Sequence, residues 1–132
     1  PEPAVPYLHL TLSQPLPPAR RAELAQSLTD LTERLLAKRR EVTALSVSQQ
    51  DAQAWFVGAQ PLVAPSYHLD VQITAGSNDA GQKAAYIAAV HALMDRALGE
   101  AHPASYVALI EIAADAWGYA GRTQAARRAD QR

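Results

Sequence analysis

The sequence contains no cysteine, and this absence excludes several classes of protein. The 132 residues offer no disulfide, no thiolate nucleophile and no sulfur ligand for zinc. An excess of charge is also missing, because the formal net charge is −1. We therefore expect no nucleic-acid partner, and the C-terminal arginines Arg127, Arg128 and Arg132 are more typical of a solvated tail.

Long apolar runs are missing as well. No stretch approaches the roughly 20 apolar residues of a membrane-spanning helix, and no secretory signal peptide is visible. We therefore expect no membrane partner and a cytoplasmic location. What is present is an ordinary globular composition, with 48% hydrophobic and 19% charged residues. We predict a single domain over residues 1–132 that is long enough to bury its own core.

A short sequence occurs twice in the chain. Residues 6–12 read Pro-Tyr-Leu-His-Leu-Thr-Leu, and residues 65–71 read Pro-Ser-Tyr-His-Leu-Asp-Val. A second echo pairs Ala-Trp-Phe-Val-Gly at 54–58 with Ala-Trp-Gly-Tyr-Ala at 116–120. Both echoes have a spacing of about 60 residues, which indicates a duplicated unit. The two repeats cover about 6–60 and about 65–124.

The first repeat predicts a strand, a helix and a second strand. Apolar and polar residues alternate from Tyr7 to Leu12, as in a half-buried strand. Leucines at 24, 28, 31 and 35 then follow helical spacing. The expected elements are a strand at 7–12, a helix that starts at Pro17 and Pro18 and is closed by the basic residues 38–40, a strand at 42–47, and a loop or short hairpin at 49–60.

The second repeat predicts the same order. Its helix has Tyr86, Val90, Leu93 and Ala97 on one face and Gly99 at the C-cap. The last strand is almost entirely apolar, which is typical of a strand buried on both faces. The expected elements are a strand at 67–73, a helix at 80–98, a strand at 106–112, an aromatic-glycine hairpin at 117–121 and a frayed end at 125–132.

The two β-α-β units together predict an α+β fold. Each crossover is right-handed, so its two strands are parallel and its helix lies on one face. We therefore predict a four-stranded mixed sheet with both helices on the same face. The other face remains partly apolar and uncovered, and such a face favours oligomerisation.

This pattern resembles the tautomerase superfamily, which includes 4-oxalocrotonate tautomerase, malonate semialdehyde decarboxylase and macrophage migration inhibitory factor. The resemblance spans residues 6–124 and is strongest to the decarboxylase-like and fused 4-oxalocrotonate tautomerase-like members. The stretches that carry it are Pro6-Tyr-Leu-His-Leu-Thr-Leu, Ser46-Val-Ser-Gln49, Gln82-Lys83, Val107-Ala-Leu-Ile-Glu111 and Asp115-Ala-Trp117-Gly-Tyr119.

The resemblance implies a homotrimer and a cofactor-independent tautomerase. It implies catalysis by an amino-terminal proline on the keto and enol forms of small 2-oxo acids. A terminal proline is a secondary amine, and an apolar pocket lowers the pKa of such an amine toward 7, where it serves as a general base. A neighbouring arginine would bind the substrate carboxylate.

The position of the family's proline corresponds to Pro6, while the sequence begins at Pro1. Only one of the two can be a free amine. Pro1 is the candidate base if residues 1–5 fold back to deliver it. Pro6 is the candidate base if translation starts at the codon of Val5, which as GTG can serve as a bacterial start. A third alternative is that neither proline is catalytic.

The expected arginines after the strands are absent, because the matching stretches read Gln14-Pro15-Leu16 and Gly76-Ser77-Asn78. The remaining candidates for binding the carboxylate are Arg39, Arg40 and Arg122. For Arg39 and Arg40 we weigh capping of the helix end as the favoured alternative, and for Arg122 a solvated loop. Trp117 and Tyr119 either line an apolar substrate pocket or pack in a trimer contact.

Other residues set the limits of the functional hypothesis. His9 and His68 are too few for a metal site, so we predict none. Glu111 is either a carboxylate with a perturbed pKa or the exposed end of its strand. The acid expected before the second strand is replaced by Val42, which weakens decarboxylation. The alternatives to a tautomerase are an inactive binding or structural trimer, and a decarboxylase or hydratase of small oxo or unsaturated acids.

Overall fold

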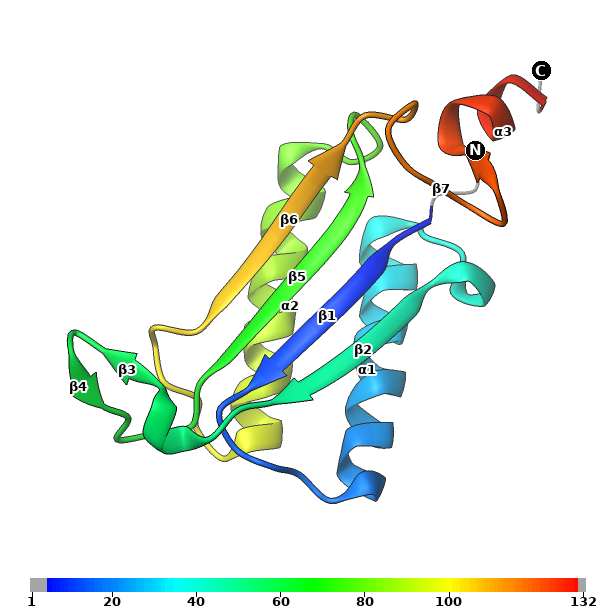
Figure 1. Ribbon diagram of the computed structural model, residues 1–132. Coiled ribbons are helices and arrows are strands. Elements are labelled where there is room, and N and C mark those ends of the chain that lie inside the picture. Colours follow the sequence, from blue (N-terminus) through cyan, green and yellow to red (C-terminus); the bar gives the residue numbers. More distant parts are fainter. Residues whose placement is uncertain (1–4, 131–132) are drawn as a thin grey trace.

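The computed structural model describes residues 5–130 and shows two β-α-β units in succession (Figure 1). The first unit contains β1 (Tyr7–Leu12), α1 (Pro18–Leu36), the 3₁₀ turn η1 (Arg40–Val42) and β2 (Ala44–Gln49). A connection follows with the 3₁₀ turn η2 (Ala52–Ala54), β3 (Phe56–Val57) and β4 (Gln60–Pro61). The second unit contains β5 (Tyr67–Thr74), α2 (Ala80–Leu98) and β6 (Tyr106–Ile112). The chain then forms β7 (Gly118–Tyr119), β8 (Arg122–Thr123) and α3 (Gln124–Asp130).

The four long strands form one mixed sheet in the order β2-β1-β5-β6. Strands β1 and β2 are parallel, β5 and β6 are parallel, and β1 and β5 are antiparallel at the centre. Figure 1 shows α1 and α2 side by side behind this sheet. The predicted fold class, the parallel strand pairs and the placement of both helices on one face are therefore confirmed.

The core lies between the sheet and the two helices. Leu8, Leu10 and Leu12 of β1 are fully buried, and the residues between them are not. The alternation continues in β5, so the period of 2 in the sequence marks the helix-facing side of both central strands. The other core residues are Leu24, Leu28, Leu31, Leu36, Tyr67, Leu69, Val71, Ile73, Tyr86, Val90, Met94, Leu98 and Ala101.

Helix α1 starts as predicted and ends earlier than predicted. Pro17 is its N-cap and Pro18 its first residue, where a missing N–H has no cost. The helix ends at Leu36, and Ala37 takes a left-handed conformation with φ 57°. The basic residues 38–40 therefore follow the helix and do not close it. The stop also makes Leu36 the buried residue of the last turn, while Leu35 is partly buried.

Helix α2 has the predicted bounds and a rotated face. A capping box joins the side chains of Asp79 and Gln82 to each other's backbone N–H, and Gly99 caps the other end at φ 71°. Tyr86 and Val90 are buried as expected. Met94 and Leu98 continue the buried stripe, whereas the expected Leu93 and Ala97 are only partly buried.

Two predictions about the second repeat are wrong. Strand β6 is an edge strand rather than one buried on both faces, and Tyr106 at its start is 63% exposed. The sheet order places the second strand of each unit, β2 and β6, at an edge, so an apolar sequence does not by itself mark a strand buried on both faces. The end predicted to fray at 125–132 is helical as far as it is described, because residues 124–130 form α3 and residues 131–132 lie outside the described residues. The reason is tertiary, since backbone bonds to the preceding hairpin hold this helix.

The face of the sheet opposite the helices is polar at its centre. Tyr7 Oη lies 2.7 Å from Ser46 Oγ, and His9 Nε2 lies 2.8 Å from Ser48 Oγ. His68 Nε2 lies 2.9 Å from Asp70 Oδ1. The large apolar side chains exposed on this face are Tyr7, Tyr106 and Ile110. The apolar part that the sequence predicts is thus concentrated on the β6 edge.

Two core tyrosines should make the stability of the protein fall at high pH. Burial raises the pKa of Tyr86 from 10.0 to about 12, and burial followed by the charge of Asp95 raises the pKa of Tyr67 to about 12. The folded protein then keeps protons that the unfolded chain releases. The free energy of unfolding should therefore decrease between about pH 10 and 12, by up to ~1.4 kcal/mol per pH unit for each tyrosine.

The variant Tyr86→Phe tests this assignment. Its hydroxyl lies 2.9 Å from Thr32 Oγ1, and Thr32 keeps its own bond to the Leu28 carbonyl when the phenol is removed. Urea unfolding at a series of pH values should give a shallower decline for Tyr86→Phe than for the wild type. Identical slopes for the two proteins would show that Tyr86 does not contribute.

Candidate active site

Pro6 lies at the end of the sheet where β1 begins. It is buried, and its carbonyl accepts a hydrogen bond of 3.4 Å from the Ala44 N–H at the start of β2. Because β1 is antiparallel to β5, the start of β1 adjoins the end of β5. We call this sheet end, where β1 and β2 begin and β5 and β6 finish, the Pro6 end (Figure 1).

The loop that follows β5 is fixed at the Pro6 end by side-chain hydrogen bonds. Ser77 Oγ donates to the Thr74 carbonyl at 2.6 Å. The Asn78 amide donates to the Leu36 carbonyl at 3.0 Å, so it joins this loop to the last turn of α1. Both bonds satisfy carbonyl oxygens that would otherwise have no hydrogen-bond donor at the end of a strand and of a helix. The loop 75–79 therefore has one defined position against α1.

Lys38 is buried beside this loop. Its side chain enters because Ala37, in the left-handed conformation, turns the chain at the end of α1. Lys38 Nζ donates to Ser77 Oγ at 2.8 Å, and Lys38 is only 3% exposed. The sequence predicted that this residue, together with Arg39 and Arg40, closes the helix, and it did not predict that Lys38 is buried. The burial follows from the left-handed conformation of Ala37, and the residues Ala37 and Lys38 give no sign of that conformation in the sequence.

Trp117 is brought to the Pro6 end by a hydrogen bond to β5. Its indole Nε1–H donates to Thr74 Oγ1 at 3.1 Å, and Thr74 is fully buried. The hairpin that carries Trp117 brings two backbone segments so close together that a Cβ on Gly118 would lie 1.9 Å from the Arg122 carbonyl oxygen. Glycine is thus required at this position. This hydrogen bond joins Trp117, one of the predicted substrate-binding residues, to the end of β5.

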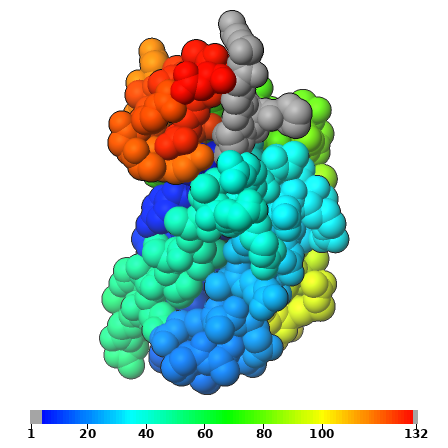
Figure 2. Space-filling model, turned by 90° about the vertical axis from the view of Figure 1, so that its right-hand side faces the viewer, coloured from blue at the N-terminus to red at the C-terminus, as the bar shows by residue number. Residues whose placement is uncertain are grey.

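Helix α3 holds the hairpin in place. The Gln124 N–H donates to the Trp117 carbonyl at 2.9 Å. Arg127 donates to the Tyr119 carbonyl at 2.9 Å, and its guanidinium carbon lies 3.8 Å from the centre of the Tyr119 ring. Arg122 forms an ion pair with Asp130. Figures 1 and 2 place α3 at the sheet end where β1 begins. Tyr119 and Arg122 are therefore held at that end by their bonds to residues of α3.

Arg39 and Arg40 form ion pairs with acidic residues of η1 and α1. Arg40 Nη1 lies 2.5 Å from Asp30 Oδ1 and 3.5 Å from Glu33 Oε1, both on α1. The hydrogen bond that Arg40 donates to Asp30 is the main cause of a raised pKa for Arg40. Arg39 Nε lies 3.6 Å from the Glu41 carboxylate, with both side chains largely exposed. These pairs favour a role in fixing η1 over one in binding a substrate.

Residues 68–127 match the family model described as Tautomerase enzyme. The fold of the whole chain is also that of solved tautomerase structures. A fused 4-OT solved as a symmetric trimer, named Q0, is 21% identical with a TM-score of 0.82, and the alignment covers 91% of this chain and 97% of that chain. The family-model match and the structural matches together support the assignment of the chain to the tautomerase superfamily. No curated protein matches the sequence.

Two further superfamily structures are similar over the same length. A native fused 4-OT is 25% identical with a TM-score of 0.78, and the protein Pt0534, solved after inactivation by 2-oxo-3-pentynoate, is 16% identical with a TM-score of 0.82. Each alignment covers 91% of this chain and 97% of that chain. The resemblance that the repeat suggested is therefore confirmed for the superfamily and the fold.

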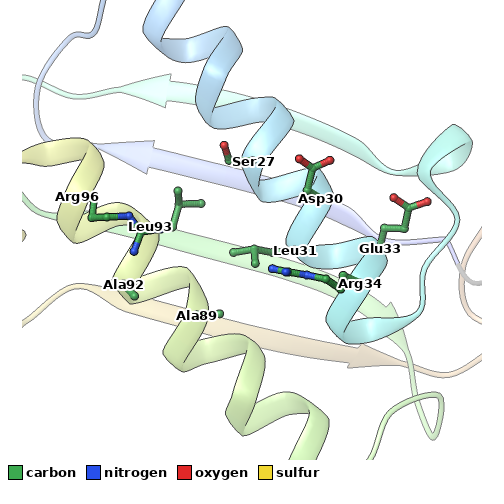
Figure 3. A pocket seen from close by; sticks show the side chains of 9 residues that line it. All are labelled: Ser27, Asp30, Leu31, Glu33, Arg34, Ala89, Ala92, Leu93 and Arg96. Atoms are coloured by element: carbon green, nitrogen blue, oxygen red, sulfur yellow. The ribbon is translucent and has the colours of Figure 1, made fainter.

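One hollow in the described part of the chain lies away from the Pro6 end. It is a groove of about 600 Å³ between α1 and α2, and Figure 3 shows side chains of both helices along it. Leu31 and Leu93 lie in it, and Arg34 and Arg96 come from the two helices. A smaller hollow of about 340 Å³ lies in the β7–β8 hairpin and is lined by Trp117 and Arg122 among others. We place the candidate site at the Pro6 end because Lys38, the loop 75–79 and Trp117 meet at that end of the sheet.

Glu111, whose role the sequence left open, has a partner on α2. Lys83 Nζ lies 3.3 Å from Glu111 Oε1, so Glu111 joins β6 to α2. Within residues 5–130, no cluster of three or more histidines, aspartates and glutamates could hold a metal ion. No helix in the same range is long and apolar enough to cross a membrane. Pro1 lies outside the described residues.

The hydroxyl of Thr74 should be what orients Trp117. In Thr74→Val the indole N–H loses its acceptor at nearly constant volume, so the free energy of unfolding should decrease by about 1–3 kcal/mol. Thr74→Ser keeps the acceptor and serves as the matched control. In a Trp55→Phe background, the fluorescence emission of Trp117 should shift in the valine variant and remain in the serine variant. Equal spectra for the two variants would exclude this role of Thr74.

Proposed function

We propose that this protein is a cofactor-independent tautomerase that interconverts the keto and enol forms of small 2-oxo acids, with an amino-terminal proline as the base. The observation that carries the proposal is the position of Pro6. It is buried at the start of a central strand, at the end of the sheet to which Lys38 and Trp117 also come. A base in such surroundings meets its substrate away from bulk water.

The chemistry requires one group that both accepts and donates a proton. A terminal prolyl amine removes the proton of the enol hydroxyl, and the resulting ammonium returns a proton to the substrate carbon as the carbonyl forms. The atoms of the substrate are unchanged, so no redox partner is consumed. The aromatic ring of Trp117 offers an apolar surface for the rest of the substrate.

Either Pro1 or Pro6 provides this amine. Pro6 supplies it in a chain that starts there, and Pro1 supplies it when residues 1–5 precede Pro6. The two versions differ in a single chemical fact, because an internal proline nitrogen is an amide with no basic lone pair. They are therefore separable by changing where the chain begins.

Ketonisation of phenylenolpyruvate should depend on the free amine. If Pro1 is the base, Pro1→Ala should reduce kcat by about 10²-fold or more, the scale of general-base loss. If Pro6 is the base, the chain that starts at Pro1 should be nearly inactive and the chain that starts at Pro6 should be active. The measurement is the decrease of enol absorbance for all three proteins. Equal rates would contradict the amine mechanism and favour the inactive binding trimer.

Covalent labelling provides the control for this kinetic test. Because Pt0534 is inactivated by 2-oxo-3-pentynoate, we expect the same electrophilic 2-oxo acid to react with this protein. The secondary amine adds to the triple bond, and its proton is transferred to carbon without a leaving group. Mass spectrometry should find one added inhibitor molecule on the terminal proline. A label found only on lysine would argue against a reactive prolyl amine.

We also propose that the active form is a homotrimer. The open face of the sheet carries Tyr106 and Ile110 on the β6 edge, and Phe56 and Val63 are exposed near the β3–β4 hairpin. Exposed apolar side chains of this kind favour burial against another copy. The fused 4-OT named Q0, which has the same fold, was solved as a symmetric trimer.

Sedimentation equilibrium should give three times the chain mass of 14.2 kDa. Ile110→Asp, which places a charge on the open face, should shift the population toward the monomer. Ile87→Asp is the matched control, because Ile87 on α2 is 40% exposed and Ile110 is 39% exposed. A wild-type monomer at micromolar concentration, or an equal effect of the two substitutions, would contradict the proposed interface.

A further inference from the structure

The groove between α1 and α2 holds two arginines whose charge is not neutralised. Arg34 lies in the last turn of α1 and Arg96 in the last turn of α2, and both line the hollow of about 600 Å³. Among residues 5–130, neither guanidinium group has a hydrogen-bond or ion-pair partner. A single solvated arginine is common on a helix surface. Here two of them, from different helices, line the same hollow.

The acids of α1 that line this groove are already engaged. Asp30 precedes Arg34 by four residues, the spacing at which opposite charges on a helix normally pair. Asp30 lies instead 2.5 Å from Arg40 Nη1, and Glu33 lies 3.5 Å from the same atom. An alanine and a leucine precede Arg96 by four and three residues, so its own helix offers it no acid there. The charge left over in the groove is therefore positive.

The two arginines mark opposite ends of the groove. In the first turn of α1, Arg20 donates to the Ala97 carbonyl in the last turn of α2 at 2.7 Å. Further along α1, Thr32 Oγ1 lies 2.9 Å from Tyr86 Oη, near the start of α2. The helices thus run in opposite directions, and Arg34 follows Arg20 by 34 − 20 = 14 residues, about 21 Å along a helix axis. In Figure 3 each of the two arginine side chains extends from its helix toward the middle of the groove.

The middle of the groove is apolar and is lined by small side chains. Figure 3 shows Leu31 and Leu93 between the two arginines. Ser27 on α1 and Ala89 and Ala92 on α2 leave the space that larger side chains would fill. A hollow of about 600 Å³ is within the range of small-molecule sites.

The groove extends beyond this hollow at the Arg96 end. A smaller hollow of about 200 Å³ shares Ser27, Leu93 and Arg96 with the first. Arg20 and Glu23 also line it and add one charge of each sign, so the excess of positive charge is kept. The combined shape is long and narrow, with an apolar middle and a cation toward each end.

We propose that the α1–α2 groove binds an elongated ligand with an acidic group at each end and an apolar middle, of the class of the α,ω-dicarboxylates. Each carboxylate pairs with one guanidinium, and the methylene chain covers Leu31 and Leu93. A ligand with one acidic group can satisfy one arginine only. None of the residues that line the groove belongs to the Pro6 end, so this inference does not depend on the proposed function.

Isothermal titration calorimetry with suberate and its monomethyl ester tests the need for two charges. The wild type should bind suberate about five- to tenfold more tightly than the monoester, the scale of one further charged contact at a partly exposed site. In Arg34→Gln and in Arg96→Gln the two ligands should bind alike. Arg39→Gln is the matched control, because Arg39 pairs with Glu41 outside the groove, and it should keep the preference. Equal binding of both ligands to the wild type would overturn the inference.

A variant that fills the hollow locates the binding. Ala92 is exposed, so Ala92→Phe can close the groove without entering the core and keeps both arginines. It should abolish suberate binding, whereas Ala88→Phe, at an exposed position of α2 outside the lining, should not. The ketonisation rate of Ala92→Phe should equal that of the wild type, which separates this site from the proposed activity. Binding that survives Ala92→Phe, or a wild type that does not bind millimolar suberate, would overturn the assignment to this groove.

Discussion

The antiparallel pairing of β1 with β5 is the constraint on which the candidate site depends. It joins two β-α-β units head to tail, so the start of one central strand adjoins the end of the other. Pro6 and the loop that follows Thr74 thereby lie at the same end of the sheet, and hydrogen bonds join that loop to the end of α1 and Thr74 to the hairpin of Trp117. A parallel arrangement of the same strands would separate these groups by the length of the sheet. The site thus follows from the way in which the two repeats meet.

Patterns with a fixed period were sufficient to predict the four long strands and the two long helices. Alternation from Tyr7 to Leu12 identified β1 and its buried side, and the leucine spacing identified α1. The right-handed crossover then determined the parallel pairs and put both helices on one face. The errors have a common origin, because they concern residues whose environment is set by distant parts of the chain. Strand β6 is apolar but lies at an edge, and α3 has no apolar stripe but is held by Trp117 and Tyr119.

The charged residues of the site show the same limit more sharply. Lys38, Arg39 and Arg40 are adjacent and have equal charge, yet one is buried and two are engaged with carboxylates of α1 and η1. The difference arises from the left-handed turn at Ala37, which no local preference of alanine indicates. The sequence predicted a cluster of basic residues at the end of α1. It could not predict which of them is buried, since this depends on a single backbone angle.

The burial of Pro6 also bears on how a proline base can act. Burial disfavours the protonated form of an amine, so a prolyl amine at this position would be favoured in its neutral, basic form. The loop 75–79, fixed to α1 by Asn78 and to β5 by Ser77, gives this end of the sheet the rigidity that holding a substrate against such a base requires.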